Sequence, residues 1–392
     1  MRSGENANLQ PEEGPLRSEK ETQAAIQALR QVGNRARVYF SMPVLEGLTP
    51  RQLVDAPNGV LSKDPTGLER KDGIFRLDEV GVSFLDHVCL YGDAVFEGIL
   101  IQNRLIFRYN EHLDRLYRSL AKIHVRLPID GLTLTDRLLE TCRAVEQPAQ
   151  GAAYIRLVVT RGLGDLGINP KKCLSPTIFA VVSTIQLYAR EAYEKGIPLG
   201  LARAIRRPSA RILDPNIKSN NYLNNVLAVV EGTQEPGLLE ALMLTEEGNV
   251  AEATVDNVFS VRKGPGWEKD PSRVELHTPS AAYCLVGITR QTVMELAAKR
   301  GYRVLERGDL LPIDFVGPEK ECFMTGTGAG VMPVIRVGGV DVGDGRPGPV
   351  TLGLVDDIQA MMRDPAWGLS IDTPKEALAG ILGDLALASA IA

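Results

Sequence analysis

Short strand-like segments alternate with amphipathic helices along most of the 392 residues, and this alternation limits the possible folds more than any other feature. VFEGILIQ and RLIFR, joined at Asn103, have the pattern of a hairpin. The next segment, EHLDRLYRSLAKIHV, places Leu113, Leu116, Leu120 and Ile123 at helical spacing. The second half repeats the alternation, with the helical patterns NNYLNNVLAVVEG and ITRQTVMELAAKRG between short strands. We therefore expect an α/β fold (mixed α+β), compatible with mixed as well as parallel sheets.

The sequence changes character near residue 185, which predicts a two-domain organisation. Residues 1–36 are polar and are expected to form an N-terminal arm with a helix, because Ser18 and Glu21 make a capping box. We assign 37–184 to a small α/β domain and 185–392 to a larger one.

Composition argues against several classes of protein. Lys and Arg number 44 and Asp and Glu 49, so the net charge of -5 supplies no positive field for nucleic acid or an anionic membrane. Five separated cysteines without a CxxC pair, and four histidines without ligand spacing, predict neither disulfides nor a metal site. No signal peptide and no apolar run of roughly 20 residues is present. These observations favour a cytoplasmic protein that binds a small molecule.

One lysine stands in an unusual context. DPNIKSNNYLNN places Lys218 in a polar turn inside a region that otherwise has the pattern of packed protein. Lysines are usually solvated surface residues, and this is the simpler interpretation. Glu252, in GNVAEATVDNVF, lies in an apolar setting where a buried carboxylate would need a cationic or N–H partner. Its simpler interpretation is a solvated glutamate beside a turn.

Three further segments have the chemistry of an anion site. Gly287, Ile288 and Thr289 lie where a helix begins, so free N–H groups and the positive end of the helix dipole are expected there. FMTGTGAG, with Thr327, has the glycine spacing of an anion-binding turn but lacks the context of a dinucleotide fingerprint. In IFRYNEHLDRL, either Arg108 or Arg115 could hold a phosphate. An ordinary helix cap, an empty glycine turn and surface ion pairs are the alternatives.

Together these segments provide an amine nucleophile, an acid and several phosphate donors. Pyridoxal 5'-phosphate requires each of them, because its aldehyde condenses with a lysine, its ring nitrogen pairs with an acid and its phosphate accepts hydrogen bonds.

The order of the motifs also points to a family. YGDAVFEG, IFRYNEHLDRL, YIRLVVTRGLGDLGINP, IKSNNYLNN, GNVAEATVDNVF, GITRQTV and FMTGTGAG, in this order, closely resemble the class IV aminotransferases of fold type IV. Within that family, which is D-amino acid aminotransferase-like in fold, they are most similar to the branched-chain amino acid aminotransferases. The resemblance covers roughly residues 75 to 335 and makes 185–392 the cofactor-binding domain.

The resemblance implies a role for each motif residue. Lys218 would form the Schiff base with pyridoxal 5'-phosphate and move the substrate proton, Glu252 would face the pyridine nitrogen, and Tyr222 would bond the phenolic oxygen. The phosphate would be held by Arg108, Gly287, Ile288, Thr289 and Thr327. The substrate would be bound by Tyr91, Phe96, Gly98, Tyr154, Arg156, Thr327 and Gly328.

The resemblance also implies an assembly. Tyr91 and the loop GLGDLGI are expected near a substrate cavity, in the same or in a neighbouring subunit, so a homo-oligomer, at least a dimer, is expected. Amino acids and 2-oxo acids would be the partners, with L-leucine, L-isoleucine or L-valine donating to 2-oxoglutarate.

Three features depart from the family's usual motifs. GTGAG stands where GTAAE is common, so Gly328 and Gly330 carry no side chain. Leu100 and Gln102 follow FEG where many relatives have an arginine and a tyrosine. Residues 45–70 form a longer segment than usual and have no assignment.

Other functions remain open on the sequence. A D-amino acid aminotransferase or an aminodeoxychorismate lyase shares the fold, and a protein that only binds the cofactor would keep some of these residues. The glycine spacing disfavours an NAD-dependent enzyme.

Overall fold

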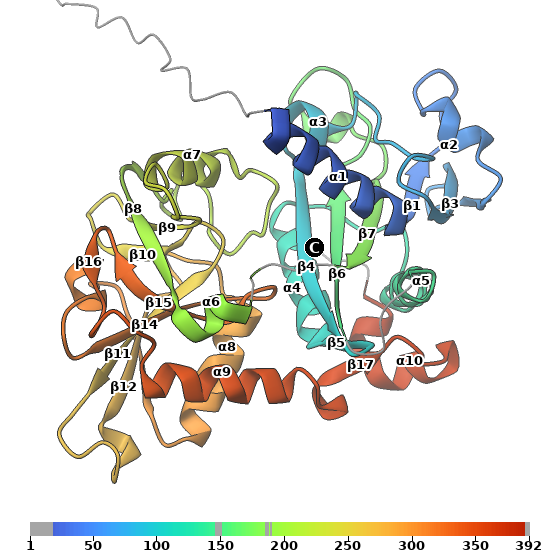
Figure 1. The fold of residues 1–392 in the computed structure, drawn as a ribbon. Helices are drawn as coiled ribbons and strands as arrows, with labels where there is room; N and C mark the ends of the chain where they lie inside the picture. Colours follow the sequence, from blue (N-terminus) through green and yellow to red (C-terminus); the bar gives the residue numbers. More distant parts are fainter. Residues whose placement is uncertain (1–18, 146–150, 185–187, 189, 389–392) are drawn as a thin grey trace, which may run out of the picture.

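The computed structural model describes residues 19–388, except 146–150, 185–187 and 189. Two separate β-sheets with helices around them make up the molecule (Figure 1). Ser18, one half of the predicted capping box, lies outside the described residues; the predicted arm helix is described as α1, Glu19–Arg35.

The first sheet has eight antiparallel strands in the order β17-β5-β4-β6-β7-β1-β3-β2. In chain order the strands are β1 (Arg37–Pro43), β2 (Gly59–Lys63), β3 (Glu69–Phe75), β4 (Ala94–Gln102), β5 (Leu105–Phe107), β6 (Ala152–Thr160), β7 (Ile178–Thr184) and β17 (Gly368–Ser370). The helices of this half are α2 (Arg51–Asp55), α3 (His87–Tyr91), α4 (Tyr109–Lys122), α5 (Gly131–Arg143) and α10 (Lys375–Leu382). The hairpin predicted around Asn103 is the β4–β5 pair, and the helix predicted after it is α4.

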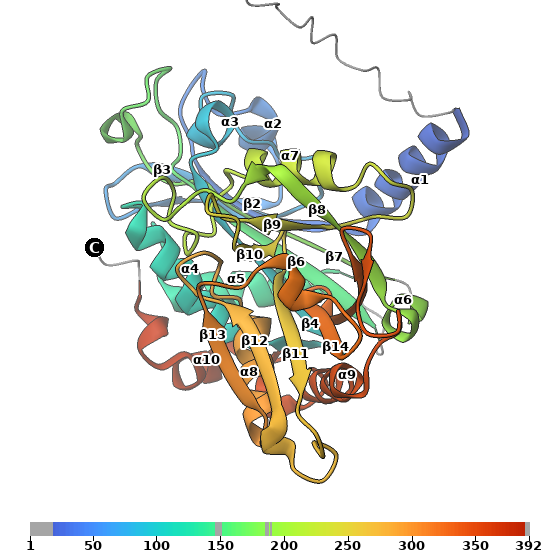
Figure 2. The same cartoon turned by 90° about the vertical axis from the view of Figure 1, so that its left-hand side faces the viewer.

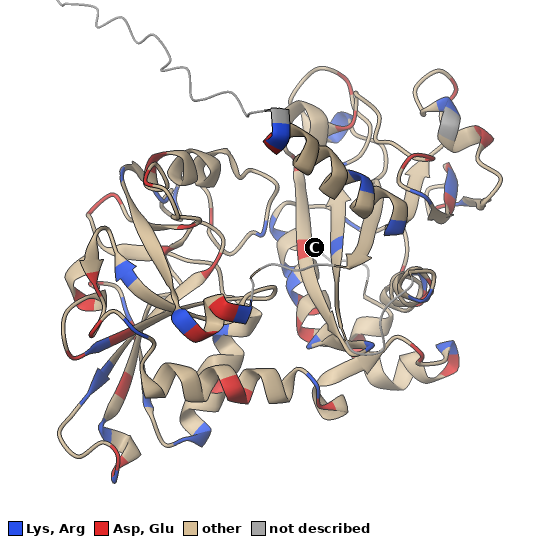
Figure 3. Ribbon diagram, in the orientation of Figure 1, with Lys and Arg blue, Asp and Glu red and all other residues tan. Residues whose placement is uncertain are grey.

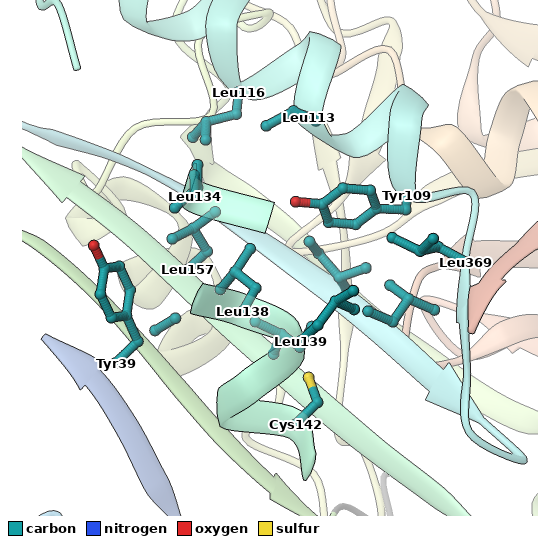
Figure 4. Close-up of a cluster of buried hydrophobic side chains, with 14 of the residues drawn as sticks. Tyr39, Tyr109, Leu113, Leu116, Leu134, Leu138, Leu139, Cys142, Leu157 and Leu369 are labelled. Carbon is teal, nitrogen blue, oxygen red and sulfur yellow. The ribbon is translucent and has the colours of Figure 1, made fainter. Parts of the chain in front are cut away.

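Helices α4 and α5 cover one face of this sheet. Their apolar side chains meet those of the central strands in a buried cluster, part of which includes Tyr39, Leu138 and Leu157 (Figure 4). Because neighbouring side chains of a strand point to opposite faces, the alternate residues of β4 point away from this cluster, toward the second sheet. The first sheet therefore separates a hydrophobic core from a face that is available for chemistry.

The second sheet mixes parallel and antiparallel pairs, in the order β10-β9-β8-β15-β14-β11-β12-β13, with β16 beside β15. Its strands are β8 (Ile197–Arg206), β9 (Ala241–Leu244), β10 (Val250–Ala253), β11 (Asn257–Lys263), β12 (Val274–Pro279), β13 (Arg303–Arg307), β14 (Lys320–Gly326), β15 (Gly330–Val337) and β16 (Val340–Asp341). The helices are α6 (Arg190–Lys195), α7 (Leu223–Gly232), α8 (Ile288–Lys299) and α9 (Pro349–Met361). The predicted mixed α/β fold is confirmed.

The chain crosses between the sheets more than once. It leaves the first sheet after β7, builds the second, and returns through α9 to β17, which pairs with β5 (Figures 1 and 2). The boundary near residue 185 stays a prediction, and the segment from β17 onward pairs with the first sheet rather than the second. The unassigned segment 45–70 forms α2, β2 and the start of β3 at one end of the first sheet.

Charged residues of both signs are interspersed around the two halves (Figure 3). Among the described residues, no helix is both long and apolar enough to cross a membrane. The same residues contain no group of three or more metal-binding side chains.

Candidate active site

Lys218 lies in the connection between β8 and α7, at a point where this connection hydrogen-bonds to the start of β4. The N–H of Phe96 donates to the carbonyl of Lys218 at 2.9 Å, and the N–H of Asn220 donates to the carbonyl of Ala94 at 2.9 Å. The lysine Nζ then lies 4.6 Å from the centroid of the Phe96 ring. The polar turn in the sequence therefore attaches the second half of the chain to β4 and holds the amine in place.

Lys218 lines a cavity of about 400 Å³ between the two sheets. Eight of the residues predicted for the site line it, namely Phe96, Gly98, Tyr154, Arg156, Lys218, Tyr222, Thr327 and Gly328. They come from β4, β6, the connection before α7 and the loop between β14 and β15. The sequence motifs thus meet at one place.

Burial and cationic neighbours change the acidity of Lys218. Burial lowers the pKa of its ammonium group to about 8, Arg115 and Arg156 contribute in the same direction, and the carboxylates of Glu97 and Glu252 oppose them. A sizeable fraction of the amine is therefore neutral near pH 7.5, the form that attacks a carbonyl.

Glu252 on β10 is buried and hydrogen-bonded through both oxygens. Arg207 Nη2 lies 2.9 Å from Oε1, while Asn257 Nδ2 and the N–H of Leu285 each donate to Oε2 at 3.2 Å. Burial raises the pKa of this carboxyl, and Arg207 and Lys218 oppose the shift. The carboxyl thus has a fixed position close to the amine.

Tyr222 precedes the first residue of α7 and packs edge-on against Phe96, with 5.4 Å between the ring centroids. Burial, followed by the charge of Glu252, raises the pKa of its hydroxyl to about 12. The hydroxyl is therefore protonated at neutral pH and can donate a hydrogen bond into the cavity.

The start of α8 is held tightly against Asn257. A Cβ at position 287 would lie 2.2 Å from Asn257 Oδ1, so only glycine fits there. Ile288 and Thr289 follow in the first turn, whose N–H groups lack intrahelical acceptors. Nearby on β14, which pairs with β11 at Asn257, the buried Thr325 hydroxyl has no partner among the described residues.

Arg115 reaches this helix start from α4. Its Nη1 donates to the carbonyl of Val286 at 3.2 Å, and its Nε and Nη2 bind the two oxygens of Glu97 at 2.8 and 2.7 Å. His112 Nδ1 contacts the same carboxylate at 2.7 Å. Burial raises the pKa of Glu97, but Arg115 outweighs it and lowers the pKa to about 2. This is a buried charge cluster between Lys218 and α8.

Arg108, predicted to hold the phosphate, lies elsewhere. It stands at the start of α4, forms ion pairs with Glu111 and Glu295, and stacks 4.5 Å from the Trp367 ring centroid. Glu295 lies in the second half of α8, whereas Arg115 contacts the carbonyl of Val286 just before that helix, so Arg115 and not Arg108 is the arginine beside its first turn. The two arginines lie in one sequence motif, and only their surroundings distinguish them.

Tyr91 is also absent from the cavity wall among the described residues. It ends α3, and its hydroxyl donates to the carbonyl of Leu166. Leu166 and Ile168, in the GLGDLGI loop, are 72% and 76% exposed. Tyr91 and the GLGDLGI loop therefore contact one another, but neither lines the Lys218 cavity of the same chain.

The sheet face beneath the cavity has one close approach. A Cβ at position 98 would lie 1.8 Å from the Tyr154 hydroxyl oxygen, so glycine is required opposite this tyrosine. The guanidinium of Arg156 lies 4.6 Å from the Phe96 ring centroid and 5.7 Å from that of Tyr154. One exposed cation thus stands over an aromatic floor.

Five lining residues were missed from the sequence, namely Tyr188, Asn220, Val255, Asp256 and Ala329. Tyr188 precedes α6, and no motif marked it. Asp256 stood within GNVAEATVDNVF, where a second acid in an apolar run was the available signal. Burial and then the charge of Glu240 raise the pKa of Asp256 to about 7, although Lys218 opposes this. Its carboxylate contacts Gly326, where a Cβ would be 1.6 Å from Oδ1.

These groups fit pyridoxal 5'-phosphate. The cavity supplies a partly neutral amine and a protonated phenol. Glu252, which is not among its described lining residues, supplies a fixed carboxyl near the amine. Helix α8 supplies free N–H groups beside a buried arginine and an unpartnered hydroxyl. An anion would complete that last set of donors.

The comparisons with known proteins identify the family. The family model for class IV aminotransferases matches residues 94–337. A relative in Methanocaldococcus jannaschii is 36% identical over 291 residues, 74% of this chain and 93% of its own. A branched-chain-amino-acid aminotransferase of Pseudomonas aeruginosa is 34% identical over 68% of this chain and 83% of its own.

A solved structure has a similar fold. The branched-chain amino acid aminotransferase from Thermobaculum terrenum, in its holo form with PLP (pyridoxal 5'-phosphate), matches with a TM-score of 0.64 at 27% identity, over 76% of this chain and 96% of that one. The architecture is that of fold type IV. The chain belongs to the class IV aminotransferases.

Proposed function

We propose that this protein is a branched-chain amino acid aminotransferase, which uses pyridoxal 5'-phosphate to transfer the amino group of L-leucine, L-isoleucine or L-valine to 2-oxoglutarate. The observation that carries the proposal is the Lys218 amine, with its lowered pKa, at the wall of a cavity that also contains Arg156 and Phe96. The relatives named branched-chain-amino-acid aminotransferases support the choice of substrate.

The ring of the cofactor would be held at three points. Lys218 would bind it covalently, Glu252 would pair with its ring nitrogen, and Tyr222 would donate to its phenolic oxygen. Its phosphate would accept hydrogen bonds from Ile288 and Thr289 at the start of α8 and from Arg115, with Thr327 on the other side. Arg115 takes the role first expected of Arg108, because it contacts the carbonyl of Val286 just before the start of α8, whereas Arg108 pairs with Glu111 and with Glu295 farther along that helix.

Bound there, the cofactor supplies a ring that withdraws electrons from the substrate Cα and so makes its proton acidic. Lys218 would move that proton between the substrate Cα and the cofactor's C4', because it is the basic group at the cavity wall with a pKa near neutrality. Glu252, anchored by Arg207, would hold its carboxyl in place for the ring nitrogen.

The substrate side of the cavity must accept both an aliphatic chain and a second carboxylate. Arg156, with Tyr154 beside it, would bind the γ-carboxylate of glutamate, and Phe96 would contact the aliphatic chain. Gly98 leaves the room that Tyr154 occupies. The loop at Thr327 and Gly328 would donate N–H groups to the α-carboxylate.

The assembly and location are part of the proposal. Tyr91 is held by the loop that carries Leu166 and Ile168, whose large apolar side chains are exposed. Contact with a second copy would cover them, and a homodimer in the cytoplasm is the simplest form.

The visible spectrum of the purified protein tests the proposal. Wild-type protein with pyridoxal 5'-phosphate should be yellow, should lose this absorbance on adding L-leucine, and should recover it with 2-oxoglutarate. D-alanine should have little effect. Loss of the absorbance with D-alanine but not with L-leucine, or a spectrum unchanged by L-leucine, would contradict the proposed function.

A further inference from the structure

The sheet face that floors the cavity continues beyond it. Strand alternation places every second side chain of β4 on the face turned toward the second sheet. In chain order these are Phe96, Gly98, Leu100 and Gln102. The first two line the Lys218 cavity, and the last two line a second cavity of about 680 Å³.

Strand β6 continues in the same way. Gly98 pairs with Arg156, Leu100 with Tyr154, and Gln102 with Ala152. Ala152 lines the second cavity, as Tyr154 and Arg156 line the first. The two cavities therefore share one continuous floor, with Arg156 at the end near Lys218 and no charged residue among those described at the other end.

The wall between the cavities is thin. Tyr188, Gly328 and Ala329 line both of them. The next residue, Gly330, also lines the second cavity and has a φ of 64°, a conformation that favours glycine. Apart from Tyr188, the described residues that the two cavities share carry no side chain larger than a methyl group.

The inner surface of the second cavity is apolar. It is formed by Leu100, Val331, Val355, Ile358 and Met362, all of which are buried. Its charged residues, Arg190, Glu194, Asp356 and Arg363, are all exposed, and Arg190 already pairs with Glu194 at 3.0 Å. Gln102 and Gln359, both half-buried, also line the chamber. The chamber thus has a mainly apolar interior and a charged opening.

We propose that this chamber receives the far end of the side chain of an amino acid whose amino group is at Lys218, so that the enzyme accepts straight apolar side chains longer than that of leucine. This inference rests on the proposed function and extends its substrate class. The occupant follows from the shared floor and the thin wall, which connect the chamber to the reacting end of the cavity.

The size of the effect follows from burial of apolar surface. Each methylene moved from water into an apolar site improves binding about fourfold. Therefore kcat/KM should rise about threefold to fourfold per added methylene from L-norvaline through L-norleucine and L-2-aminoheptanoate to L-2-aminooctanoate. A pocket that ended at Gly328 would give values that fall after norleucine.

The experiment measures kcat/KM for this series and for L-leucine with 2-oxoglutarate. A rise through L-2-aminooctanoate supports the inference. Turnover of L-leucine together with a fall after norleucine overturns it and leaves the proposed function intact. Absence of any turnover of L-leucine rejects the proposed function itself.

A binding measurement separates affinity from turnover. Saturated straight-chain carboxylates carry the apolar chain without the amino group, so titration calorimetry with hexanoate and octanoate reports the chamber alone. Octanoate should bind the cofactor-loaded enzyme about tenfold more tightly than hexanoate. Equal affinities would contradict the inference.

Two substitutions fill the chamber from α9 and its end, Val355→Phe and Met362→Trp. Either should reduce kcat/KM for L-2-aminooctanoate about tenfold or more and change that for L-valine less than about twofold. Val340→Phe, on the 52% exposed Val340 of β16, is the matched control and should change neither. Thermal unfolding checks that each variant folds. An equal loss for L-valine and L-2-aminooctanoate in the folded variants would overturn the inference.

Discussion

Two arginines of the α4 segment pair with acids of different exposure. Arg108, which precedes the first residue of α4, makes ion pairs with Glu111 and Glu295, whose side chains are 42% and 46% exposed. Arg115, in the middle of the helix, pairs with Glu97, whose side chain is 1% exposed. Both arginines are buried, so the two sites differ in whether the carboxylates remain in contact with water.

The difference teaches where charge matters in this molecule. An exposed pair gains little, because water already solvates both partners. A buried pair has lost that solvation, so each member depends on the other. The buried cluster also affects its neighbours, since Arg115 lowers the pKa of Lys218, whereas Arg108 does not figure among the causes of that shift. The following predictions compare the two environments, from the largest effect to the smallest.

Removing the amine should have the largest effect. Lys218→Ala should lower kcat for L-leucine by at least about a thousandfold, because the substitution removes both the nucleophile and the proton carrier. Stopped-flow or steady-state assays measure the loss. Lys299→Ala, which removes a lysine that contacts only the Trp367 ring among the interactions described, should retain activity. Turnover by the Lys218 variant near the wild-type rate would refute its role.

Arg115→Met should weaken binding of pyridoxal 5'-phosphate about a hundredfold, because a charge-assisted contact with the phosphate is lost. It should also lower the free energy of unfolding by about 3–5 kcal/mol, since Glu97 remains buried without its main partner. Cofactor titration and urea unfolding measure the two effects.

A second substitution separates these effects. Adding Glu97→Gln to Arg115→Met removes the stranded carboxylate and should recover part of the stability without restoring cofactor affinity. If both properties recover together, Arg115 acts through folding alone.

Asp256→Asn tests a buried acid that forms no ion pair with a described residue. The pKa of Asp256 is raised from 3.8 to about 7, so the folded state binds more protons than the unfolded state between these values. Wild-type stability from this group therefore falls as pH rises through that window. The asparagine variant should gain stability over the wild type, little at pH 4 and up to about 4 kcal/mol at pH 8. Urea unfolding of both proteins without cofactor at the two pH values measures the difference, and a pH-independent difference would contradict it.

Arg108→Met should have the smallest effect. It removes ion pairs to half-exposed carboxylates and a cation–π contact, so the free energy of unfolding should fall by about 1 kcal/mol or less. Cofactor affinity should change less than about threefold. An affinity loss as large as that of Arg115→Met would remove the distinction between the two arginine sites.

The sequence predicted much of the site because its chemistry lies in contiguous motifs. Lys218, Tyr222, Phe96 and Arg156 were identified from local residues and their order, and the structure brings them to one cavity. The choice between Arg108 and Arg115 could not be made this way, because it depends on Glu97 and Glu295, which lie on other elements.

The fold, like the site, was predictable where it depends on local sequence. Periodicity predicted the β4–β5 hairpin and helices α4 and α8, which are local. It could not predict that β17 pairs with β5, since the two strands are far apart in sequence and β17 has only three residues. Tyr188 was missed because its position in the cavity depends on how the chain crosses between the sheets.

The return of the chain to its first sheet has a consequence for how the protein is made. Leu369, Ile371, Leu378 and Leu382 belong to the same buried cluster as Tyr39. Roughly 180 residues separate the end of β7 from β17, so at about 5–20 residues per second the ribosome needs on the order of 10–40 seconds to supply them. Throughout that interval the buried cluster of the nascent first half lacks the side chains that β17 and α10 contribute. The apolar side chains of α4 and α5 that they would cover stay exposed.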